Sequence, residues 1–515
     1  MNGAESMLQT LMNNGVEVCF TNPGTSEMHM VAAIGESDGM RSILCLFEGV
    51  CSGAADGYAR MLAKPACTLL HLGPGLSNAS ANLHNARKAN SSVINLIGDH
   101  ATYHKKLDAP LNSDVIGLSG PISHWVRSVT NAASLPSDAA DAVLAANVKP
   151  GQIATLIVPA DSAWNESVDP VTARDMPSAP LVGDESVKTA AELLTNGKTT
   201  ILLMSNLALS ERCLDLADQI SQATGAKIFC DTFVTRLPRG EGRCSVARLG
   251  YFAEQATEQI KDAEQLIMVY TKAPVSFFAY PGKVSEFSPQ NSTQHTLAQV
   301  SEDAEDALQK LVTELNAGNH HPRKRSLQKP GLGSGELSSK NLALTFAELL
   351  PVDSVVVDEG GTAGALCFPI SENAQPHDWL TITGGSIGYG LPVAVGAAVA
   401  CPDRKIICLQ GDGGAMYTIQ ALWTMARENL DVCIVILANR KYQILQVELA
   451  RVGAQSMNKK TLDMMDLTNP NLDFVKMSES MGVKAARAHN ADEFNKLFAQ
   501  GMEEPGPMLI EALLT

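Results

Sequence analysis

Asp412 and Asn439 are polar residues that each follow a strongly apolar stretch. Asp412 lies in "QGDGGA" after "KIICL", and Asn439 comes directly after "VCIVILA". Both stretches are apolar on both faces, as buried parallel strands are, and the segment between them has helical spacing. Because parallel strands joined by a helix end at the same edge of a sheet, we expect the two side chains to lie close together.

The glycines around Asp412 suit a phosphate ligand. Gly411, Gly413 and Gly414 would let the backbone approach phosphate oxygens, and the helix that follows directs its N–H groups at the same place. A carboxylate beside a diphosphate is repulsive unless a hard cation lies between them, and Mg²⁺ prefers oxygen ligands. The pattern predicts a diphosphate held through Mg²⁺. A tight turn at the Gly-Asp-Gly triplet, with Asn439 as a helix cap, is the alternative reading.

These residues resemble the thiamine-diphosphate motif of the 2-oxo acid decarboxylase and acetolactate synthase family, and the chain is most similar to its benzoylformate decarboxylase branch. The motif usually ends in two asparagines, and here Ala438 occupies the first of these places. The resemblance implies Mg²⁺ ligands at Asp412, Asn439 and the backbone carbonyl of Lys441. It also implies that Tyr442 borders the cofactor.

Three further segments extend the resemblance. "TGGSIGYG" is similar to the family's segment beneath the cofactor, so Gly385 would meet the aminopyrimidine and Ile387 would force the bent cofactor conformation. "VVDEGGTAGA" is similar to the loop that touches the diphosphate, with Thr362 as hydroxyl donor. In "LFEGVCSGAADGYAR", Glu48 matches the Glu that hydrogen-bonds the pyrimidine ring. The alternative is a carboxylate that only stabilises a helix N-terminus.

The resemblance also implies a set of residues that face the substrate. Thr25 in "NPGTSE" and His71 in "LLHLGPG" match a serine and a histidine of the benzoylformate decarboxylase branch. A lone histidine is more often structural, but the surrounding match favours His71 as a proton relay. Leu111, Ile444 and Glu448 would line the substrate pocket.

Two departures bear on the reaction. The second histidine of the benzoylformate decarboxylase branch is replaced near "PVSFFAYPG", where Ala279 or Tyr280 falls. Acetolactate synthases carry a Phe-Gln pair where this chain has Pro110 and Leu111. We therefore predict a decarboxylase or carboligase for a 2-oxo acid. The alternatives are an acetolactate synthase that condenses two pyruvates and a non-catalytic, cofactor-binding homologue.

The arrangement of apolar runs indicates how these residues are positioned. Short apolar runs alternate with helical patterns in three successive stretches, which predicts an α/β protein with three doubly wound parallel sheets. The expected domains are a pyrimidine-binding domain (1–165), a central domain (186–315) and a diphosphate- and Mg²⁺-binding domain (336–515). Polar segments rich in Pro, Gly and Ser separate them, and "PRKR" in the second is expected to be a solvated tether.

Composition excludes several classes of partner. The formal net charge of −16 argues against nucleic acid, because phosphate-backbone binding needs clustered Lys and Arg. No apolar run approaches the roughly 20 residues that span a bilayer, so no membrane partner is expected. Eleven cysteines without a C-x-x-C pair indicate reduced core thiols and a cytoplasmic protein.

The resemblance sets the remaining expectations. The cofactors would be thiamine diphosphate and Mg²⁺. The central domain lacks a convincing G-x-G-x-x-G turn, which argues against FAD. In the family, Glu48 and Asp412 would come from different subunits, so we expect a homodimer or homotetramer with the cofactor at the subunit interface.

Overall fold

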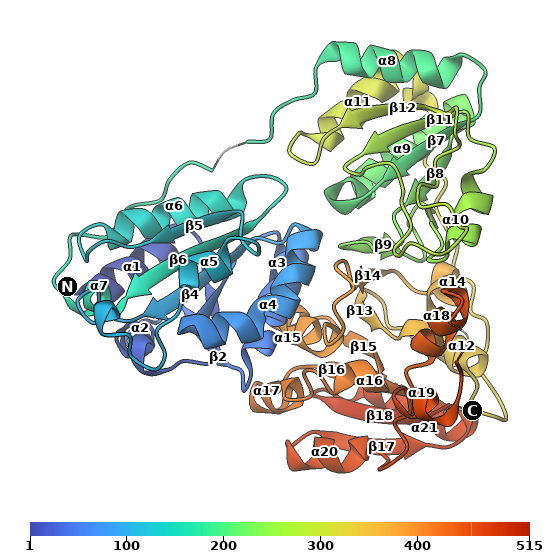
Figure 1. Ribbon diagram of the computed structural model, residues 1–515. Helices are drawn as coiled ribbons and strands as arrows, with labels where there is room; N and C mark the ends of the chain where they lie inside the picture. Colours follow the sequence, from blue (N-terminus) through green and yellow to red (C-terminus); the bar gives the residue numbers. More distant parts are fainter. Residues whose placement is uncertain (177, 455, 515) are drawn as a thin grey trace.

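The structure is a computed structural model that describes residues 1–176, 178–454 and 456–514. It contains three sheets, one in each of three lobes (Figure 1). The first lobe is drawn in blue and teal, the second in green and yellow, and the third in orange and red. Nearly all strand pairs are parallel and are connected through helices, so the predicted α/β class with three parallel sheets is confirmed.

The first lobe holds a six-stranded parallel sheet of order β2-β1-β3-β4-β6-β5. Its strands are β1 (Val18–Thr21), β2 (Arg41–Leu44), β3 (Ala66–His71), β4 (Val93–Asp99), β5 (Trp125–Ser128) and β6 (Ile153–Pro159). Its helices are α1 (Gly3–Asn13), η1 (Thr25–Glu27), α2 (Met28–Gly35), α3 (Glu48–Leu62), α4 (Leu72–Ala89), η2 (Lys105–Leu107), α5 (Val115–Ser119), α6 (Leu135–Asn147) and α7 (Ala160–Trp164).

The second lobe holds a five-stranded sheet of order β10-β8-β7-β11-β12. Its strands are β7 (Thr200–Met204), β8 (Lys227–Cys230), β10 (Ala247–Arg248), β11 (Gln265–Val269) and β12 (Thr293–Ala298). Its helices are α8 (Asp184–Thr195), η3 (Asn206–Leu209), α9 (Glu211–Thr224), α10 (Ala253–Ile260), α11 (Ala304–Glu314) and η4 (Ala317–Asn319).

The third lobe holds a seven-stranded sheet of order β17-β18-β16-β15-β13-β14-β9. Its strands are β9 (Leu237–Arg239), β13 (Ser354–Glu359), β14 (His377–Thr381), β15 (Ile406–Gly411), β16 (Val432–Ala438), β17 (Lys484–Ala488) and β18 (Met508–Leu513). Its helices are α12 (Ser339–Leu349), α13 (Gly361–Gly364), α14 (Cys367–Ile370), η5 (Ser371–Asn373), α15 (Gly390–Ala400), α16 (Asp412–Ala415), α17 (Ala421–Arg427), α18 (Gln443–Arg451), α19 (Lys459–Asp463), α20 (Phe474–Ser480) and α21 (Ala491–Glu503).

Strand β9 joins two lobes. It lies within the range predicted for the central domain, yet it pairs with β14 at the edge of the third sheet. The pairing is antiparallel, with Leu237 opposite Trp379 and Arg239 opposite His377. A three-residue strand has no recognisable periodicity, so the sequence pattern does not indicate this connection. The limits of the three domains stay predictions.

The first and third lobes meet where α3 packs against α15. A Cβ atom on Gly57 would lie 2.3 Å from the carbonyl oxygen of Val393, and one on Gly396 would lie 1.9 Å from the carbonyl oxygen of Ala54. Real side chains do not approach backbone atoms so closely, so glycine is required at both places. The small residues of "GVCSGAADGYA" and "GLPVAVGAAVA" therefore let two helix backbones touch.

Two smaller expectations can also be compared with the structure. Arg323, with 62% of its side chain exposed, pairs with Asp218 at 2.7 Å, and Arg325 pairs with Glu372, so "PRKR" is a partly solvated segment fastened to the lobes on either side by surface ion pairs. All cysteines are free thiols, and all but Cys401 are buried, as expected for core residues. In the described ranges, every helix is too short or too polar to cross a lipid bilayer.

Candidate active site

Asp412 and Asn439 lie at the same edge of the third sheet. Strands β15 and β16 are neighbours in register, with Gly411 opposite Leu437, and the two polar residues come just beyond them. Both carboxylate oxygens of Asp412 accept backbone hydrogen bonds, from Gly413 N at 2.9 Å and from Arg440 N at 2.6 Å. The structure thus brings together the two side chains that the βαβ pattern predicts to be close.

Asn439 is connected to two other elements. Its Nδ2 donates to Oε1 of Gln443 on α18 at 3.1 Å, and Thr362 on α13 donates its hydroxyl to the same atom at 3.4 Å. The Oδ1 of Asn439 accepts from the backbone N–H of Lys441 at 3.2 Å. The loop at Thr362, the strand end at Asn439 and the start of α18 therefore form one group.

The carboxyl group of Asp412 lies in surroundings that disfavour a negative charge. It is buried, and burial raises the pKa of this carboxyl although backbone N–H groups of Arg440 and Gly413 oppose the shift. A bound cation would offset the cost of keeping the carboxylate ionised. In the described residues no three His, Cys, Asp or Glu side chains are grouped to hold a metal. Any metal here would therefore need amide and backbone oxygens beside Asp412.

Two of the three glycines beside Asp412 leave no room for side chains. A Cβ on Gly413 would lie 2.3 Å from the ring of Tyr442, and one on Gly414 would lie 2.6 Å from Oε1 of Glu359. One on Gly411 would be 3.4 Å from the carbonyl oxygen of Glu359, which is an ordinary contact, so space alone does not require glycine there. The loop therefore presents backbone rather than side chains, as a phosphate-binding turn does.

The loop at residues 383–390 is held from below by Glu359. The two carboxylate oxygens of Glu359 accept from the backbone N–H groups of Gly388 at 2.6 Å and Gly390 at 2.5 Å. Gly385 has a φ of +72°, a conformation that side-chain-bearing residues rarely adopt. Ile387 stands at the exposed tip, with 38% of its surface accessible. An apolar residue held outward in this way suits the predicted support beneath a cofactor.

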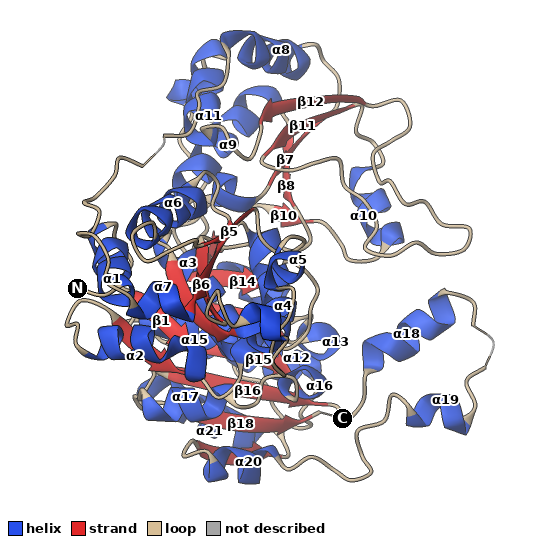
Figure 2. Ribbon diagram, turned by 60° about the vertical axis from the view of Figure 1, so that its left-hand side comes forward, coloured by secondary structure: helices blue, strands red, loops and turns tan. Residues whose placement is uncertain are grey.

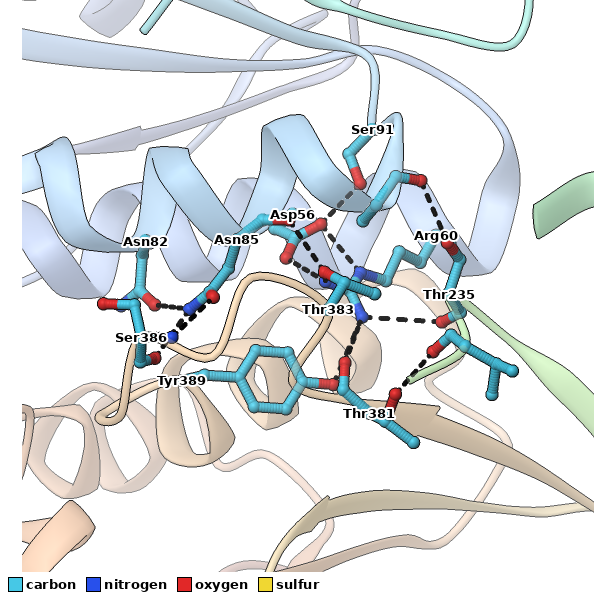
Figure 3. Close-up of polar contacts among 12 residues, drawn as sticks. Asp56, Arg60, Asn82, Asn85, Ser91, Thr235, Thr381, Thr383, Ser386 and Tyr389 are labelled. Atoms are coloured by element: carbon cyan, nitrogen blue, oxygen red, sulfur yellow. Dashed lines mark hydrogen bonds and ion pairs between the residues drawn. The ribbon is translucent and has the colours of Figure 1, made fainter. Parts of the chain in front are cut away.

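Two asparagines of α4 fix the same loop to the first lobe (Figure 3). Asn85 donates to the carbonyl of Ser386 at 2.8 Å and accepts from its N–H at 3.1 Å. Asn82 donates to the carbonyl oxygens of Gly388 and Gly49 at 3.1 and 2.9 Å. Both asparagine side chains are buried, so the loop is tied to α4 without access to water.

A buried ion pair completes this attachment. Arg60 and Asp56, one turn apart on α3, pair at 2.6 Å with both side chains fully inaccessible. Arg60 also donates to the carbonyl of Thr381, the hydroxyl of Thr383 and the phenol of Tyr389 (Figure 3). Burial opposes the charge of the guanidinium, but Asp56 outweighs it and the pKa of Arg60 is raised. The pair thus joins α3 to both ends of the loop.

Glu48 is the first residue of α3 and is 8% exposed. Its Oε2 accepts a hydrogen bond from Nδ2 of Asn78 on α4 at 2.9 Å. In the part of the chain that the structure describes, the side-chain hydrogen bonds of Asp412 and Asn439 go to other residues than Glu48.

His71 ends β3 and pairs with a carboxylate that the sequence pattern does not single out. Its Nδ1 lies 2.8 Å from Oε2 of Glu27, which is completely buried, and 3.2 Å from the hydroxyl of Ser26. The same Glu27 oxygen accepts from the N–H of Gly24 at 2.7 Å. A carboxylate in this position fixes the tautomer and the orientation of the imidazole. The acidic residue two places after Thr25 is the only sequence signal.

The other predicted substrate residues are more dispersed. Thr25 opens η1 and is exposed, while the recorded contacts of His71 come from its neighbours Ser26 and Glu27. Leu111 is 41% exposed in the loop before α5. Ile444 and Glu448 are one turn apart on α18, which places them on one face of that helix.

Phe277 is the residue of "PVSFFAYPG" that reaches the loop at Gly385. A Cβ on Gly385 would lie 2.5 Å from the Phe277 ring, whose centre is 5.5 Å from those of Phe233 and Tyr251. That Ala279 or Tyr280 takes the place of the second histidine stays a prediction. Nothing in the local pattern distinguishes these positions, because the segment is irregular.

Comparison with known proteins agrees with this geometry. Residues 1–118 match the model for the thiamine pyrophosphate enzyme N-terminal TPP-binding domain, and residues 361–512 match that for the C-terminal TPP-binding domain. A Mycobacterium tuberculosis H37Rv protein named "Putative acetolactate synthase large subunit IlvX" is 47% identical, over 100% of this chain and 99% of its own length. This chain belongs to the thiamine pyrophosphate enzyme family.

Other thiamine pyrophosphate enzymes are similar over nearly the whole chain. Benzoylformate decarboxylase of Pseudomonas aeruginosa is 25% identical over 98% of this chain and 97% of its own. Acetolactate synthase isozyme 1 large subunit of Escherichia coli K12 is also 25% identical, over 99% and 93%. The solved structure of the 4-hydroxybenzoylformate decarboxylase of Rhodococcus jostii RHA1 has a TM-score of 0.86 at 22% identity and covers 100% and 99% of the two chains, which shows a shared fold.

The two matched regions contain the candidate residues of this thiamine pyrophosphate enzyme. Glu48 and His71 lie in the N-terminal region, and Thr362, Asp412 and Asn439 lie in the C-terminal one. Family membership supports thiamine diphosphate as the cofactor. The assignment of individual residues stays a prediction.

Proposed function

We propose that this protein is a Mg²⁺-dependent decarboxylase or carboligase of a 2-oxo acid, similar to benzoylformate decarboxylase. The observation that carries the proposal is the group at the carboxyl ends of β15 and β16. There, a buried carboxylate, a carboxamide and side-chain-free backbone lie together at the sheet edge. That donor set suits a diphosphate bridged to the protein by a hard cation.

The residues present fit both groups. Asp412, the Oδ1 of Asn439 and the carbonyl of Lys441 would hold Mg²⁺, and burial of Asp412 raises its pKa, a cost that a cation would relieve. Gly411, Gly413 and Gly414 would present backbone to the diphosphate, with Tyr442 packed against Gly413. Loss of the usual first asparagine at Ala438 leaves these oxygen donors in place.

The remaining candidates would handle protons. When bound, thiamine diphosphate supplies a thiazolium that accepts the electron pair released when carbon dioxide leaves a 2-oxo acid. Glu48, desolvated at the start of α3, would hold a proton at the pyrimidine ring nitrogen. His71, oriented by Glu27, would exchange a proton at its Nε2 with the substrate, and Thr25 would offer the substrate a hydroxyl.

A second subunit is part of the proposal. Among the described residues, Glu48 hydrogen-bonds to Asn78 and Asp412 to the backbone of Gly413 and Arg440, and a partner copy would place Glu48 of one chain at the Asp412 site of the other. The exposed apolar residues Leu46, Leu111, Met416 and Tyr417 support a subunit interface near these elements. We propose a homodimer or homotetramer. The free, buried thiols support a reducing compartment such as the cytoplasm.

Acetolactate synthase activity on pyruvate is the second candidate. The 47% identical mycobacterial relative carries that name, which favours it. Pro110 and Leu111, in place of the Phe-Gln pair, favour the decarboxylase. Both activities would use the same cofactor and the same Asp412, Asn439 and Glu48.

A substrate screen tests the proposal. The purified protein is supplied with thiamine diphosphate and Mg²⁺ and incubated separately with benzoylformate, pyruvate and other 2-oxo acids. Carbon dioxide, free aldehyde and acetolactate are then measured. Aldehyde from an aryl or alkyl 2-oxo acid is the expected result, and acetolactate from pyruvate would establish the second candidate.

Glu48→Gln tests the assignment of the site within that reaction. Loss of a proton-transfer group reduces turnover by about 100-fold or more, whereas cofactor binding measured by calorimetry should stay close to that of the unmodified protein. Asp412→Ala should instead abolish Mg²⁺-dependent binding of thiamine diphosphate. Absence of cofactor uptake by the folded, unmodified protein at saturating Mg²⁺ would refute the proposal.

A further inference from the structure

Helix α18 borders the candidate cofactor site at its first residues. Gln443 begins the helix and accepts hydrogen bonds from Asn439 and Thr362, and the ring of Tyr442, which precedes the helix, packs on Gly413. Yet none of the nine residues of α18 is buried. Figure 2 shows α18 and α19 at the right-hand edge, on a long excursion between β16 and α20. Core packing therefore does not hold this helix.

The opposite end of α18 is fastened to the second lobe. Arg451, its last residue, forms an ion pair with Glu254 of α10 at 2.6 Å. Its guanidinium also lies over two aromatic rings of that lobe, 4.3 Å from the ring centre of Phe252 and 4.9 Å from that of Tyr280. Glu254 is in turn 3.0 Å from Lys283. One side chain thus makes a charge pair and two cation–π contacts.

A second contact lies one turn earlier on the same helix. Glu448 is adjacent to the phenols of Tyr251 and Tyr280, and burial together with this carboxylate raises the pKa of both phenols. Tyr251 also packs against Phe277, the residue that touches Gly385. The anchored face of α18 is therefore continuous with the aromatic residues next to the site.

The geometry connects the two ends. A nine-residue helix is a stiff rod about 13 Å long, so a restraint at its last turn limits the position of its first turn. Within the described residues, the ion pair and the cation–π contacts of the last turn lead to the second lobe rather than to the third, in which α18 begins.

We propose that Arg451 is a positioning residue for the cofactor site. By fastening α18 to Glu254, Phe252 and Tyr280, it keeps Gln443 and Tyr442 against the cofactor-binding loops. It takes no part in proton or electron transfer. This inference rests on the cofactor site of the proposed function, and it adds that the second lobe controls how firmly that site is closed.

Three substitutions separate the parts of this contact. Arg451→Met removes the charge and keeps an apolar stem, Arg451→Lys keeps the charge but loses the flat guanidinium, and Glu254→Gln removes the ion pair but keeps the stacking. Lys459→Met is the matched control, because Lys459 forms an ion pair with Asp463 on the neighbouring α19 and is 88% exposed.

Two measurements are made on the full-length protein. Hydrogen exchange of the 443–451 amides is followed without and with thiamine diphosphate and Mg²⁺, and cofactor affinity is measured by calorimetry. For Arg451→Met we expect faster exchange and an affinity about fivefold to tenfold weaker, from loss of one exposed ion pair and two cation–π contacts. Turnover at saturating cofactor should change less than about twofold, since binding rather than chemistry is affected.

The variants should rank by the contacts they retain. Arg451→Lys and Glu254→Gln are expected to fall between the unmodified protein and Arg451→Met. The double variant Glu254→Gln/Arg451→Met should be no worse than Arg451→Met alone, because both changes break the same pair. Lys459→Met should leave both measurements unchanged.

Either of two results would overturn the inference. One is Arg451→Met with the exchange and affinity of the unmodified protein. The other is Lys459→Met with the same losses as Arg451→Met, which would show a general effect of charge. If the unmodified protein bound no thiamine diphosphate, the proposed function would fail, while exchange without cofactor would still report whether Arg451 anchors α18.

Discussion

The loop at residues 383–390 and helix α18 both border the candidate cofactor site, and they are held in different ways. The loop is tied by the buried side chains of Asn82, Asn85 and Arg60, all of them inaccessible or nearly so. Helix α18 has no buried residue and is tied at the surface by Arg451. Buried polar contacts are costly to break, whereas exposed ones are not.

The two kinds of attachment suit two different functions at a binding site. A segment that must hold reacting groups at fixed distances benefits from a buried network in which every polar group has a hydrogen-bond partner, because partial disruption leaves charges unpaired. A segment past which ligands enter a site must open at a small cost in free energy. Segments with few buried contacts open most readily. On this view the loop at 383–390 sets the geometry and α18 controls access.

Arg60→Met is the sharpest test of the comparison. The substitution leaves Asp56 buried without its partner, so we expect a loss of about 3–5 kcal/mol in the free energy of unfolding. Urea denaturation of Arg60→Met and Arg451→Met measures the contrast, because the ion pair of the partly exposed Arg451 with Glu254 should contribute less than about 1 kcal/mol. Equal losses of stability in the two variants would remove the distinction between the loop at residues 383–390 and helix α18.

Gly396→Ala tests the contact between α15 and α3, the helix that carries Arg60. The added methyl group would meet the carbonyl of Ala54 at 1.9 Å, so α3 and α15 must move apart. We expect a loss of about 2 kcal/mol in stability by overpacking. Gly35→Ala is the control, since nothing lies within 4 Å of its Cβ position. If Gly396→Ala were as stable as Gly35→Ala, the contact would not be tight.

Asn85→Ala probes the loop directly. It removes the two hydrogen bonds to Ser386 and should cost about 1 kcal/mol of stability. Because Ser386 directly precedes Ile387 in this loop, binding of thiamine diphosphate should weaken as well, which calorimetry would detect. A stability loss with unchanged cofactor affinity would mean that Asn85 supports the fold but not the site.

The pH dependence of the α18 contact is the smallest expected effect. The hydrogen bond from Arg451 lowers the pKa of Glu254 to about 2. A carboxyl group with a depressed pKa contributes above its usual pKa and is lost only as the pH falls toward the depressed value. The coupling between Glu254 and Arg451, measured by cofactor affinity in a double-mutant cycle, should therefore be the same at pH 5.5 and pH 8. A marked decrease at pH 5.5 would assign the contact to another group.

Some parts of the site follow from local sequence and others do not. Asp412 and Asn439 could be placed together because adjacent parallel strands end at one edge, and Glu48 because a strand gives way to a helix there. The pairing of His71 with Glu27 spans 44 residues, and the contact of Asn85 with Ser386 spans 301. No periodicity connects positions so far apart.

Two strands and one side-chain contact could not be predicted from the local sequence pattern. Strands β5 and β17 are partly exposed and short of apolar residues, so they lack the runs that reveal β15 and β16. Phe277 reaches Gly385 from an irregular segment whose path depends on the aromatic residues around it. The path of the backbone in such segments is decided by tertiary packing rather than by the intrinsic structural propensities of the residues.

Strand β9 has a consequence for protein engineering. Its three residues interrupt the second lobe in the sequence but complete the edge of the third sheet beside β14. A chimaera that exchanged the middle lobe between two relatives would therefore also exchange this edge strand, and with it the register at Trp379. Grafts whose junctions leave residues 237–239 with their own β14 should express as folded protein more often than grafts that separate them.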